Sequence, residues 1–192
     1  MNKKDTVVFD LDGTLLDTLE DLKNSVNYAM TQCGYPEHTL DEVRRYVGNG
    51  ILLLMQRAIP GGKDDPNFDK AFTLFKEHYG KHCNDTTKPY AGIMELLHTL
   101  KENNIKIAIV SNKADFAVKE LNAIYFKDLI LVAIGEKESE GIRKKPAPDT
   151  VIEALKQLGS TAENSVYIGD SDVDIETARN SGMDEMRLGL PG

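Results

Sequence analysis

Thr-Val-Val-Phe-Asp-Leu-Asp-Gly-Thr, residues 6–14, is the stretch of the sequence that decides the fold. Its first four residues are β-branched or aromatic, and Asp10 and Asp12 follow at once. A short, nearly continuous apolar run is typical of a parallel strand that is covered on both faces. Two carboxylates at the tip of such a strand are costly to bury without a positive partner. The stretch therefore predicts a buried strand with a charged site at its carboxyl end.

Strand-like and helix-like patterns alternate through the rest of the chain. Three further apolar runs end in polar residues, at 106–111, 129–135 and 165–170. Helical periodicity follows or separates these runs at 91–103, 114–124, 149–158 and 172–181. This alternation predicts an α/β fold with a doubly wound parallel sheet.

One connection is too long for a single crossover. The first strand ends near Asp10 and the next begins near Lys106, and the intervening chain carries helical patterns at 19–32, 40–47, 51–59 and 68–83. Glycine and proline clusters separate these patterns. We therefore predict an all-helical inserted domain over 16–86 and an α/β core domain over 1–15 and 87–192.

The composition excludes several classes of protein. Of 192 residues, 41% are hydrophobic and 28% charged, which is typical of globular proteins. No stretch approaches the roughly 20 uncharged apolar residues of a membrane helix. With 23 Lys and Arg against 31 Asp and Glu, the net charge of −8 argues against nucleic acid as a partner. Two cysteines without CxxC spacing indicate a reducing compartment, so we expect a cytoplasmic protein. We also expect a monomer or a small homo-oligomer.

Acidic residues gather where the predicted strands end. Ligands of open parallel sheets bind beyond the carboxyl ends of the strands, so Asp10, Asp12, Asp170 and Asp174 are expected to share one crevice. Crowded carboxylates raise one another's pKa values, and a single lysine does not neutralise four of them. Mg²⁺ is the cation that we expect, because it binds carboxylates, water and phosphate oxygens.

These residue types suit phosphoryl transfer. Asp10 is placed to attack phosphorus and form an aspartyl-phosphate, and Asp12 to act as general acid and then as general base. Ser111 and Lys145 are expected to hold the phosphoryl oxygens. Gly13 allows the chain to turn sharply after the nucleophile.

Plainer interpretations compete at several positions. Ser111 and Asn112 would also serve to cap the helix that follows them. Of the neighbouring Lys144 and Lys145, at most one points inward, and we choose Lys145 because it precedes Pro146.

A pair of histidines is open to two interpretations as well. His78 and His82 have a spacing that can bind zinc, but they lack a third ligand, so a surface or interdomain role is favoured.

Four segments, in their order along the chain, carry a resemblance to a known family. The chain resembles the haloacid dehalogenase superfamily, and in particular its phosphoglycolate phosphatase-like branch. The four segments that carry the resemblance span nearly the whole chain and are residues 8–18, 110–113, 145–149 and 169–174.

The resemblance implies roles for individual residues. Asp10 would be the nucleophile and Asp12 the acid and base, and Mg²⁺ would bind Asp10, the Asp12 carbonyl and Asp170. Asp174 would support the site, and the phosphate would be held by Ser111, Asn112 and Lys145. An acid at the position of Asp12 favours phosphoryl transfer over carbon–halogen cleavage.

The resemblance also implies a substrate class and a role for the insert. The helical insert is similar to a cap domain, in which residues 45–50 would form a loop near the substrate. Arg44 or Arg45 would meet a substrate carboxylate, although a solvated arginine is the plainer interpretation. The expected substrate is a small phosphorylated metabolite, with 2-phosphoglycolate the leading candidate. An inorganic pyrophosphatase, a β-phosphoglucomutase-type mutase and a catalytically silent binding protein are the alternatives.

The chain departs from the family pattern after the fourth segment. Members of this branch usually continue through another strand and a closing helix, whereas this sequence stops at Gly192. Residues 185–190 are expected to form an edge strand without a helix to cover it, which predicts an exposed sheet edge.

Overall fold

The computed structural model describes residues 4–187, and the chain divides into two compact units. One, the sheet unit, comprises the chain up to Leu16 and from Pro89 onward; the other, the helical unit, comprises Asp17–Lys88. The chain passes from one unit to the other and back through β2 (Leu16–Asp17) and β3 (Lys88–Pro89), which form a two-stranded sheet.

The sheet unit contains a five-stranded parallel sheet of order β5-β4-β1-β6-β7. Its strands are β1 (Thr6–Phe9), β4 (Lys106–Ala114), β5 (Val132–Glu136), β6 (Ser165–Gly169) and β7 (Asp184–Arg187). Because β1 lies between β4 and β6, the direction of the crossovers reverses there. This is the point at which doubly wound sheets bind ligands.

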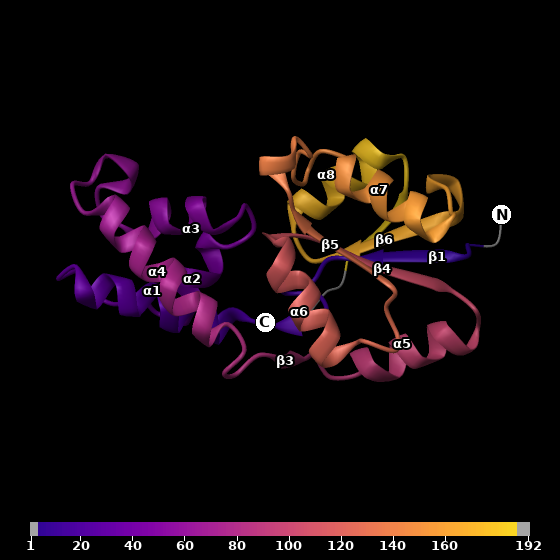
Figure 1. The fold of residues 1–192 in the computed structure, drawn as a ribbon, viewed down its shortest axis with the longest axis horizontal. Coiled ribbons are helices and arrows are strands. Elements are labelled where there is room, and N and C mark those ends of the chain that lie inside the picture. The colour runs from indigo at the N-terminus through magenta and orange to yellow at the C-terminus, as the bar shows by residue number, and fades with distance from the viewer. Residues whose placement is uncertain (1–3, 188–192) are drawn as a thin grey trace. The chain divides into compact units, whose positions relative to one another are not determined.

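Helices cover both faces of the sheet (Figure 1). Figure 1 shows α5 and α6 on one face and α7 and α8 on the other. The bounds of these helices are α5 (Ile93–Glu102), α6 (Asp115–Tyr125), α7 (Asp149–Leu158) and α8 (Asp172–Ser181). Short 3₁₀ helices span Glu138–Glu140 and Ala162–Asn164.

Strand alternation explains why β1 and the first half of β4 carry apolar residues on both faces. Val7 and Phe9 pack into the core under α5 and α6, whereas Val8 packs into the core under α7 and α8. In β4, Ile109 belongs to the first core and Val110 to the second. Since both faces are covered, a polar residue at either face would be buried, so the apolar run is continuous.

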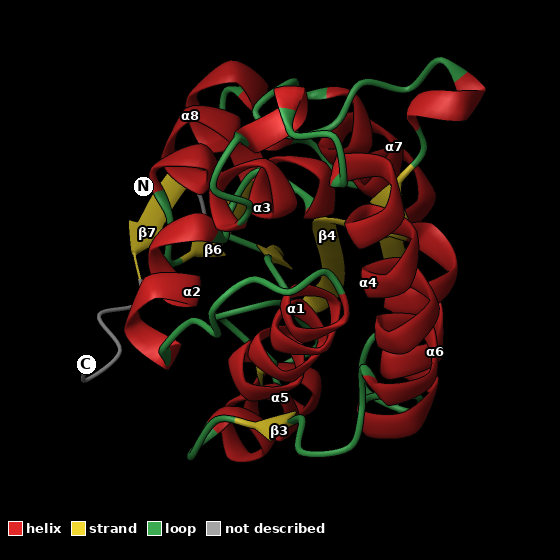
Figure 2. Ribbon diagram, turned by 90° about the vertical axis from the view of Figure 1, so that its left-hand side faces the viewer, coloured by secondary structure: helices red, strands yellow, loops and turns green. Residues whose placement is uncertain are grey.

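The helical unit consists of α-helices joined by loops (Figure 2). They are α1 (Leu19–Gln32), α2 (Leu40–Tyr46), α3 (Ile51–Ala58) and α4 (Phe68–His82), with a 3₁₀ helix at Gly62–Asp64. They enclose a core of their own, which includes Val26, Met30, Met55, Ala71 and Phe75. No helix in the described part of the chain is long and apolar enough to cross a membrane.

A buried carboxylate ties the last residues of the helical unit to its first helix. Asp21 of α1 is 1% exposed and accepts hydrogen bonds from the backbone N–H of Thr86 (3.0 Å) and Thr87 (2.9 Å). The hydroxyls of the same threonines donate to it at 2.7 and 2.8 Å. Burial alone would raise the pKa of Asp21, but these hydrogen bonds outweigh burial and lower the pKa. The ionised carboxylate therefore fixes the path of the chain at residues 86–87.

Asp21→Asn is expected to destabilise the protein by about 2–3 kcal/mol at pH 7, because an amide cannot accept from four donors. The folded pKa of Asp21 lies below its unfolded value, so its contribution is present above an unfolded pKa of about 4 and is lost as pH falls through the folded pKa. The wild type should thus lose more stability on acidification than the variant. Denaturant unfolding followed by circular dichroism at neutral and acidic pH measures both effects.

Asp41→Asn is the matched control, because the Asp41 side chain is 73% exposed and forms a surface ion pair with Arg44 at 3.0 Å. Its effect should stay below about 0.5 kcal/mol. Equal losses for the two variants would contradict the role assigned to Asp21.

Most predicted elements agree with the structure, but two strand boundaries were wrong by three residues. The strand predicted over 106–111 continues as β4 to Ala114. The run predicted as a strand from Leu129 begins as β5 only at Val132. The N–H groups of Leu129 and Ile130 both donate to the carbonyl of Phe126, which holds them in a turn after α6. Leu131 is 85% exposed, so its apolar side chain does not indicate a strand face.

The predicted edge strand is present in part. β7 pairs with β6 at the edge of the described sheet, and its four residues are exposed. Positions 188–190 of the predicted strand lie outside the described residues.

Candidate active site

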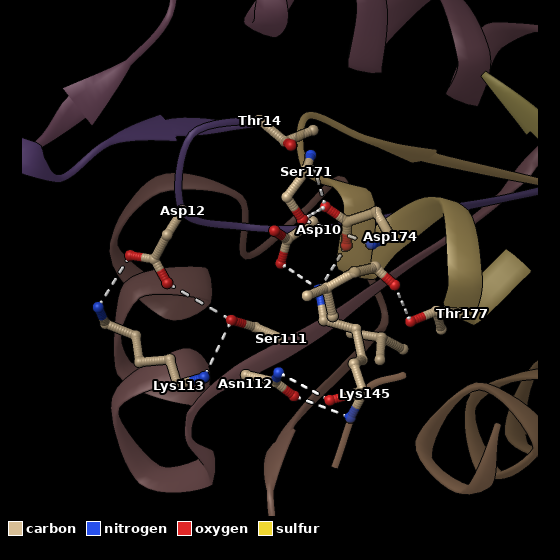
Figure 3. Close-up of polar contacts among 12 residues, drawn as sticks. Asp10, Asp12, Thr14, Ser111, Asn112, Lys113, Lys145, Ser171, Asp174 and Thr177 are labelled. Atoms are coloured by element: carbon tan, nitrogen blue, oxygen red, sulfur yellow. Dashed lines mark hydrogen bonds and ion pairs between the residues drawn. The ribbon is translucent and has the colours of Figure 1, made fainter. Parts of the chain in front are cut away.

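The polar residues predicted to share a crevice meet at the carboxyl edge of the sheet (Figure 3). Asp10 directly follows β1, Ser111 lies in β4 and Asp170 directly follows β6. Parallel pairing of β1 with both neighbours brings the ends of these strands together. The backbone N–H of Asp10 donates to the carbonyl of Ile168 at 2.9 Å, which fixes Asp10 against β6.

Lys145 joins two buried carboxylates. Its Nζ lies 2.8 Å from Asp10 Oδ1 and 2.7 Å from Asp174 Oδ1. A third contact, 3.1 Å long, goes to the hydroxyl of Tyr167, which itself donates to Asp174 Oδ1 at 3.1 Å. An ammonium group has three donors, and here all three have partners. Lys145 therefore acts as the counter-ion that allows Asp10 and Asp174 to lie side by side.

The pKa values of these groups show how the charge is balanced. Burial raises the pKa of Asp10 to about 7; Lys145 offsets part of this rise, while Asp174 and Asp12 add to it. For Asp174, burial is outweighed by Lys145 and by hydrogen bonds from Ser171, so its pKa is lowered. Lys145 alone thus leaves Asp10 poised near neutral pH. A nucleophilic carboxylate must be ionised, so the site needs further positive charge.

Asp12 is held from the neighbouring strand. Lys113 Nζ lies 2.9 Å from Asp12 Oδ1, and the hydroxyl of Ser111 donates to Asp12 Oδ2 at 3.4 Å. The Ser111 hydroxyl in turn accepts from the backbone N–H of Lys113 at 3.1 Å. Asp12 therefore points toward β4, whereas Asp10 points toward Lys145 (Figure 3).

Asn112 contacts the backbone of Lys145 on both sides. Its Oδ1 accepts from the Lys145 N–H at 2.9 Å, and its Nδ2 donates to the Lys145 carbonyl at 3.1 Å. The sequence predicted a phosphate-binding role for Asn112. In the structure its side-chain amide helps to fix the position of Lys145, and the phosphate-binding role stays a prediction.

Two glycines allow acidic side chains to lie close against the backbone. Gly13 has a φ of +82°, and a Cβ there would lie 2.6 Å from Asp170 Oδ2. A Cβ on Gly169 would lie 2.3 Å from the carboxyl carbon of Asp174. Any larger residue at either position would push a carboxylate out of place. Thr14 holds Asp170 from the same turn by donating to its Oδ1 at 3.3 Å.

Three carboxylates form a group that fits a divalent cation. Asp10, Asp170 and Asp174 each offer one oxygen, and these oxygens lie within 4.8 Å of one another. With Asp12 included, four carboxylates face two ammonium groups, those of Lys113 and Lys145, which leaves a charge of −2 when all are ionised. One divalent cation with oxygen ligands would balance that charge.

The sequence identified the acids but not all of their partners. It predicted no role for Lys113, and it indicated Tyr167 only as part of an apolar strand. Lys113 lies beyond the predicted end of its strand and within an irregular part of β4, so regular strand alternation did not indicate it. Nothing in the local pattern distinguishes Tyr167 from a core tyrosine.

The histidine pair has other partners in the described structure. The rings of His78 and His82 stack 4.4 Å apart, and they contact Ser25 Oγ (3.0 Å) and Asp85 Oδ2 (2.7 Å) respectively. Within residues 4–187, the group of three potential metal ligands is the aspartate cluster and does not include these histidines.

Comparison with known proteins agrees with the fold and identifies the family of the chain. The sequence pattern of the haloacid dehalogenase-like hydrolases matches residues 7–187. A phosphoglycolate phosphatase of Aquifex aeolicus is 33% identical over 180 residues, which cover 92% of this chain and 80% of that protein. One of Thiobacillus denitrificans is 33% identical over 182 residues, covering 92% and 79%.

A solved structure from Lactobacillus delbrueckii subsp. bulgaricus, provisionally assigned as a phosphoglycolate phosphatase, superposes with a TM-score of 0.87. It is 36% identical and covers 96% of this chain and 86% of its own. The resemblance predicted from the four segments is thereby confirmed. The chain belongs to the haloacid dehalogenase-like hydrolase family, and its relatives place it among the phosphoric monoester hydrolases of that family.

Proposed function

We propose that the chain is a Mg²⁺-dependent phosphatase that hydrolyses a small phosphorylated metabolite through an aspartyl-phosphate on Asp10, with 2-phosphoglycolate the leading candidate substrate. The observation that carries the proposal is the buried cluster of Asp10, Asp170 and Asp174 around Lys145, with its uncompensated negative charge. The names of the relatives support the substrate.

In the first half of the proposed reaction, an oxygen of Asp10 attacks phosphorus and the bond from phosphorus to the leaving oxygen breaks. Asp12, which is protonated at the start of this step, gives its proton to that oxygen. Ser111 and the backbone N–H groups at this edge of the sheet hold the non-bridging oxygens. Lys145 keeps Asp10 and Asp174 in place as charge moves from the nucleophile to the phosphoryl group.

In the second half, a water molecule attacks the phosphorus of the aspartyl-phosphate while Asp12 takes its proton. The bond from phosphorus to Asp10 then breaks, so phosphate leaves and both aspartates return to their starting states. Asp10, Asp170 and the backbone carbonyl of Asp12 would hold Mg²⁺, and Asp174 would support them. When bound, the cation supplies positive charge that keeps Asp10 ionised and polarises the phosphoryl group.

The test is phosphate release over a panel of 2-phosphoglycolate, pyrophosphate and sugar phosphates, with and without MgCl₂. We expect release from a phosphate monoester that requires Mg²⁺, stops on addition of EDTA and is restored by excess Mg²⁺. Release from pyrophosphate alone would favour a pyrophosphatase, and isomerisation of a sugar phosphate without release would favour a mutase. A folded protein supplied with Mg²⁺ that neither releases phosphate nor isomerises a sugar phosphate would overturn the proposed function.

A further inference from the structure

Lys113 is a buried cation that forms an ion pair with Asp12. Its side chain is 6% exposed and that of Asp12 is 18% exposed, and the two meet at 2.9 Å. An ion pair so shielded from water is stronger than a surface pair, because the effective dielectric constant is lower. The contact therefore fixes the orientation of the Asp12 carboxyl group.

The end of β4 provides this arrangement. Ser111 and Lys113 both contact Asp12, whereas Asn112 between them contacts Lys145. Between Val110 and Ala114 the register with β5 shifts, from Val110 opposite Ile134 to Ala114 opposite Glu136. Irregularities of this kind re-aim side chains next to active sites. The end of β4 thus carries both Ser111 and Lys113, each in contact with Asp12.

Ser111 and Lys113 differ in what they can do once a phosphoryl group is present. A serine hydroxyl has one proton, so Ser111 cannot donate to Asp12 and to a phosphoryl oxygen at once. Its contact with Asp12 is long, at 3.4 Å, and is the weaker of the two. When Ser111 turns to a phosphoryl oxygen, Asp12 Oδ2 loses that hydrogen bond. Lys113 then remains on Oδ1.

We propose that Lys113 is a positioning residue for the acid and base of the reaction: by binding Oδ1 of Asp12, it directs Oδ2 toward the leaving oxygen and then toward water. This inference rests on the proposed function. The geometry also assigns the two oxygens of Asp12 different tasks, because Oδ2 is the one on the side of Ser111, where the phosphoryl group would bind. Without Lys113 the carboxyl group would rotate away from that alignment.

The test compares substrates that differ in their need for a proton. The alkoxide that leaves 2-phosphoglycolate needs protonation, whereas the leaving groups of p-nitrophenyl phosphate and acetyl phosphate need little. Since general acid catalysis is worth about 10²–10⁴-fold, Lys113→Met should lower kcat/KM for the alkyl ester by roughly 30–100-fold and for the activated esters by less than about threefold. Lys113→Arg should restore most of the loss.

Lys119→Met is the matched control, since it removes a lysine paired with Asp115 at 2.6 Å on an exposed part of α6. It should leave kcat/KM within about twofold for every substrate. Thermal unfolding of each variant establishes that it is folded, and Lys113→Arg supplies the readout if Lys113→Met does not fold.

Equal losses on activated and alkyl esters would mean that Lys113 holds phosphate directly, and no loss on either would leave it a structural ion pair. Both results overturn this inference but not the proposed function. A wild type that hydrolyses none of the esters would overturn the proposed function and this inference with it.

Discussion

Asp10→Asn is expected to reduce phosphate release by at least about 10³-fold, because the amide has the shape of the carboxylate but is not a nucleophile. The variant should remain folded, since the new amide oxygen can still contact Lys145, and Asp174 keeps its ion pair with that lysine. Replacing a buried carboxylate whose pKa is raised to about 7 also removes a charge that burial disfavours. Initial rates at saturating Mg²⁺ and substrate measure the loss.

Asp172→Asn is the control for Asp10→Asn. Asp172 is close in sequence to the site acids, but its side chain is 89% exposed and pairs with Arg187 at 3.5 Å. Its rate should stay within about twofold of the wild type. An Asp10→Asn variant with more than a tenth of the wild-type rate would mean that another group attacks phosphorus.

Lys145→Met is expected to lower both stability and activity. Removing one partner of a buried ion pair costs about 3–5 kcal/mol, because the remaining charges stay buried without compensation. Here Asp10 and Asp174 would face each other, and the pKa of Asp10, already raised, would rise further without the ammonium. Denaturant unfolding and initial rates should therefore both report a large loss, the rate falling by roughly 10²-fold or more.

The neighbouring Lys144 provides a control with the same chemistry one residue away. It is 36% exposed and pairs with Glu138 at 3.4 Å, so Lys144→Met should cost less than about 1 kcal/mol and leave the rate nearly unchanged. Similar losses for the two variants would contradict the assignment of Lys145 as the inward lysine.

Most of the fold was predictable from the sequence, because the apolar periodicity and the residues that bound each element indicate the same helices and strands. Helices α1, α7 and α8 begin and end where predicted. Ser171 caps α8 with a capping box, and left-handed glycines, Gly159 and Gly182, end α7 and α8. The start of β5 was not predictable from the local sequence. Leu129 and Ile130 have the composition of a strand, and only their hydrogen bonds to Phe126 place them in a turn.

The candidate site was also predictable only in part. The position of Asp10, Asp12, Asp170 and Asp174 at the carboxyl edge of the sheet was predictable, because Asp10 and Asp170 directly follow strands and the other two lie a few residues further on. The partners of these acids depend on tertiary contacts. Tyr167 of β6 contacts Lys145, which precedes α7, and Asp174 of α8, while Asn112 of β4 reaches the backbone of Lys145. Such pairings follow from the packing of distant segments rather than from any local pattern.

We expect Asp10 to carry the phosphoryl group during turnover. The most direct measurement is to quench the wild-type protein in acid during turnover of 2-phosphoglycolate or acetyl phosphate with Mg²⁺, and to locate the modification by peptide mass spectrometry. We predict one phosphoryl group on Asp10 that requires Mg²⁺ and is absent from Asp10→Asn. A phosphoryl group on another residue, or undiminished hydrolysis by Asp10→Asn with no modified peptide, would contradict the account.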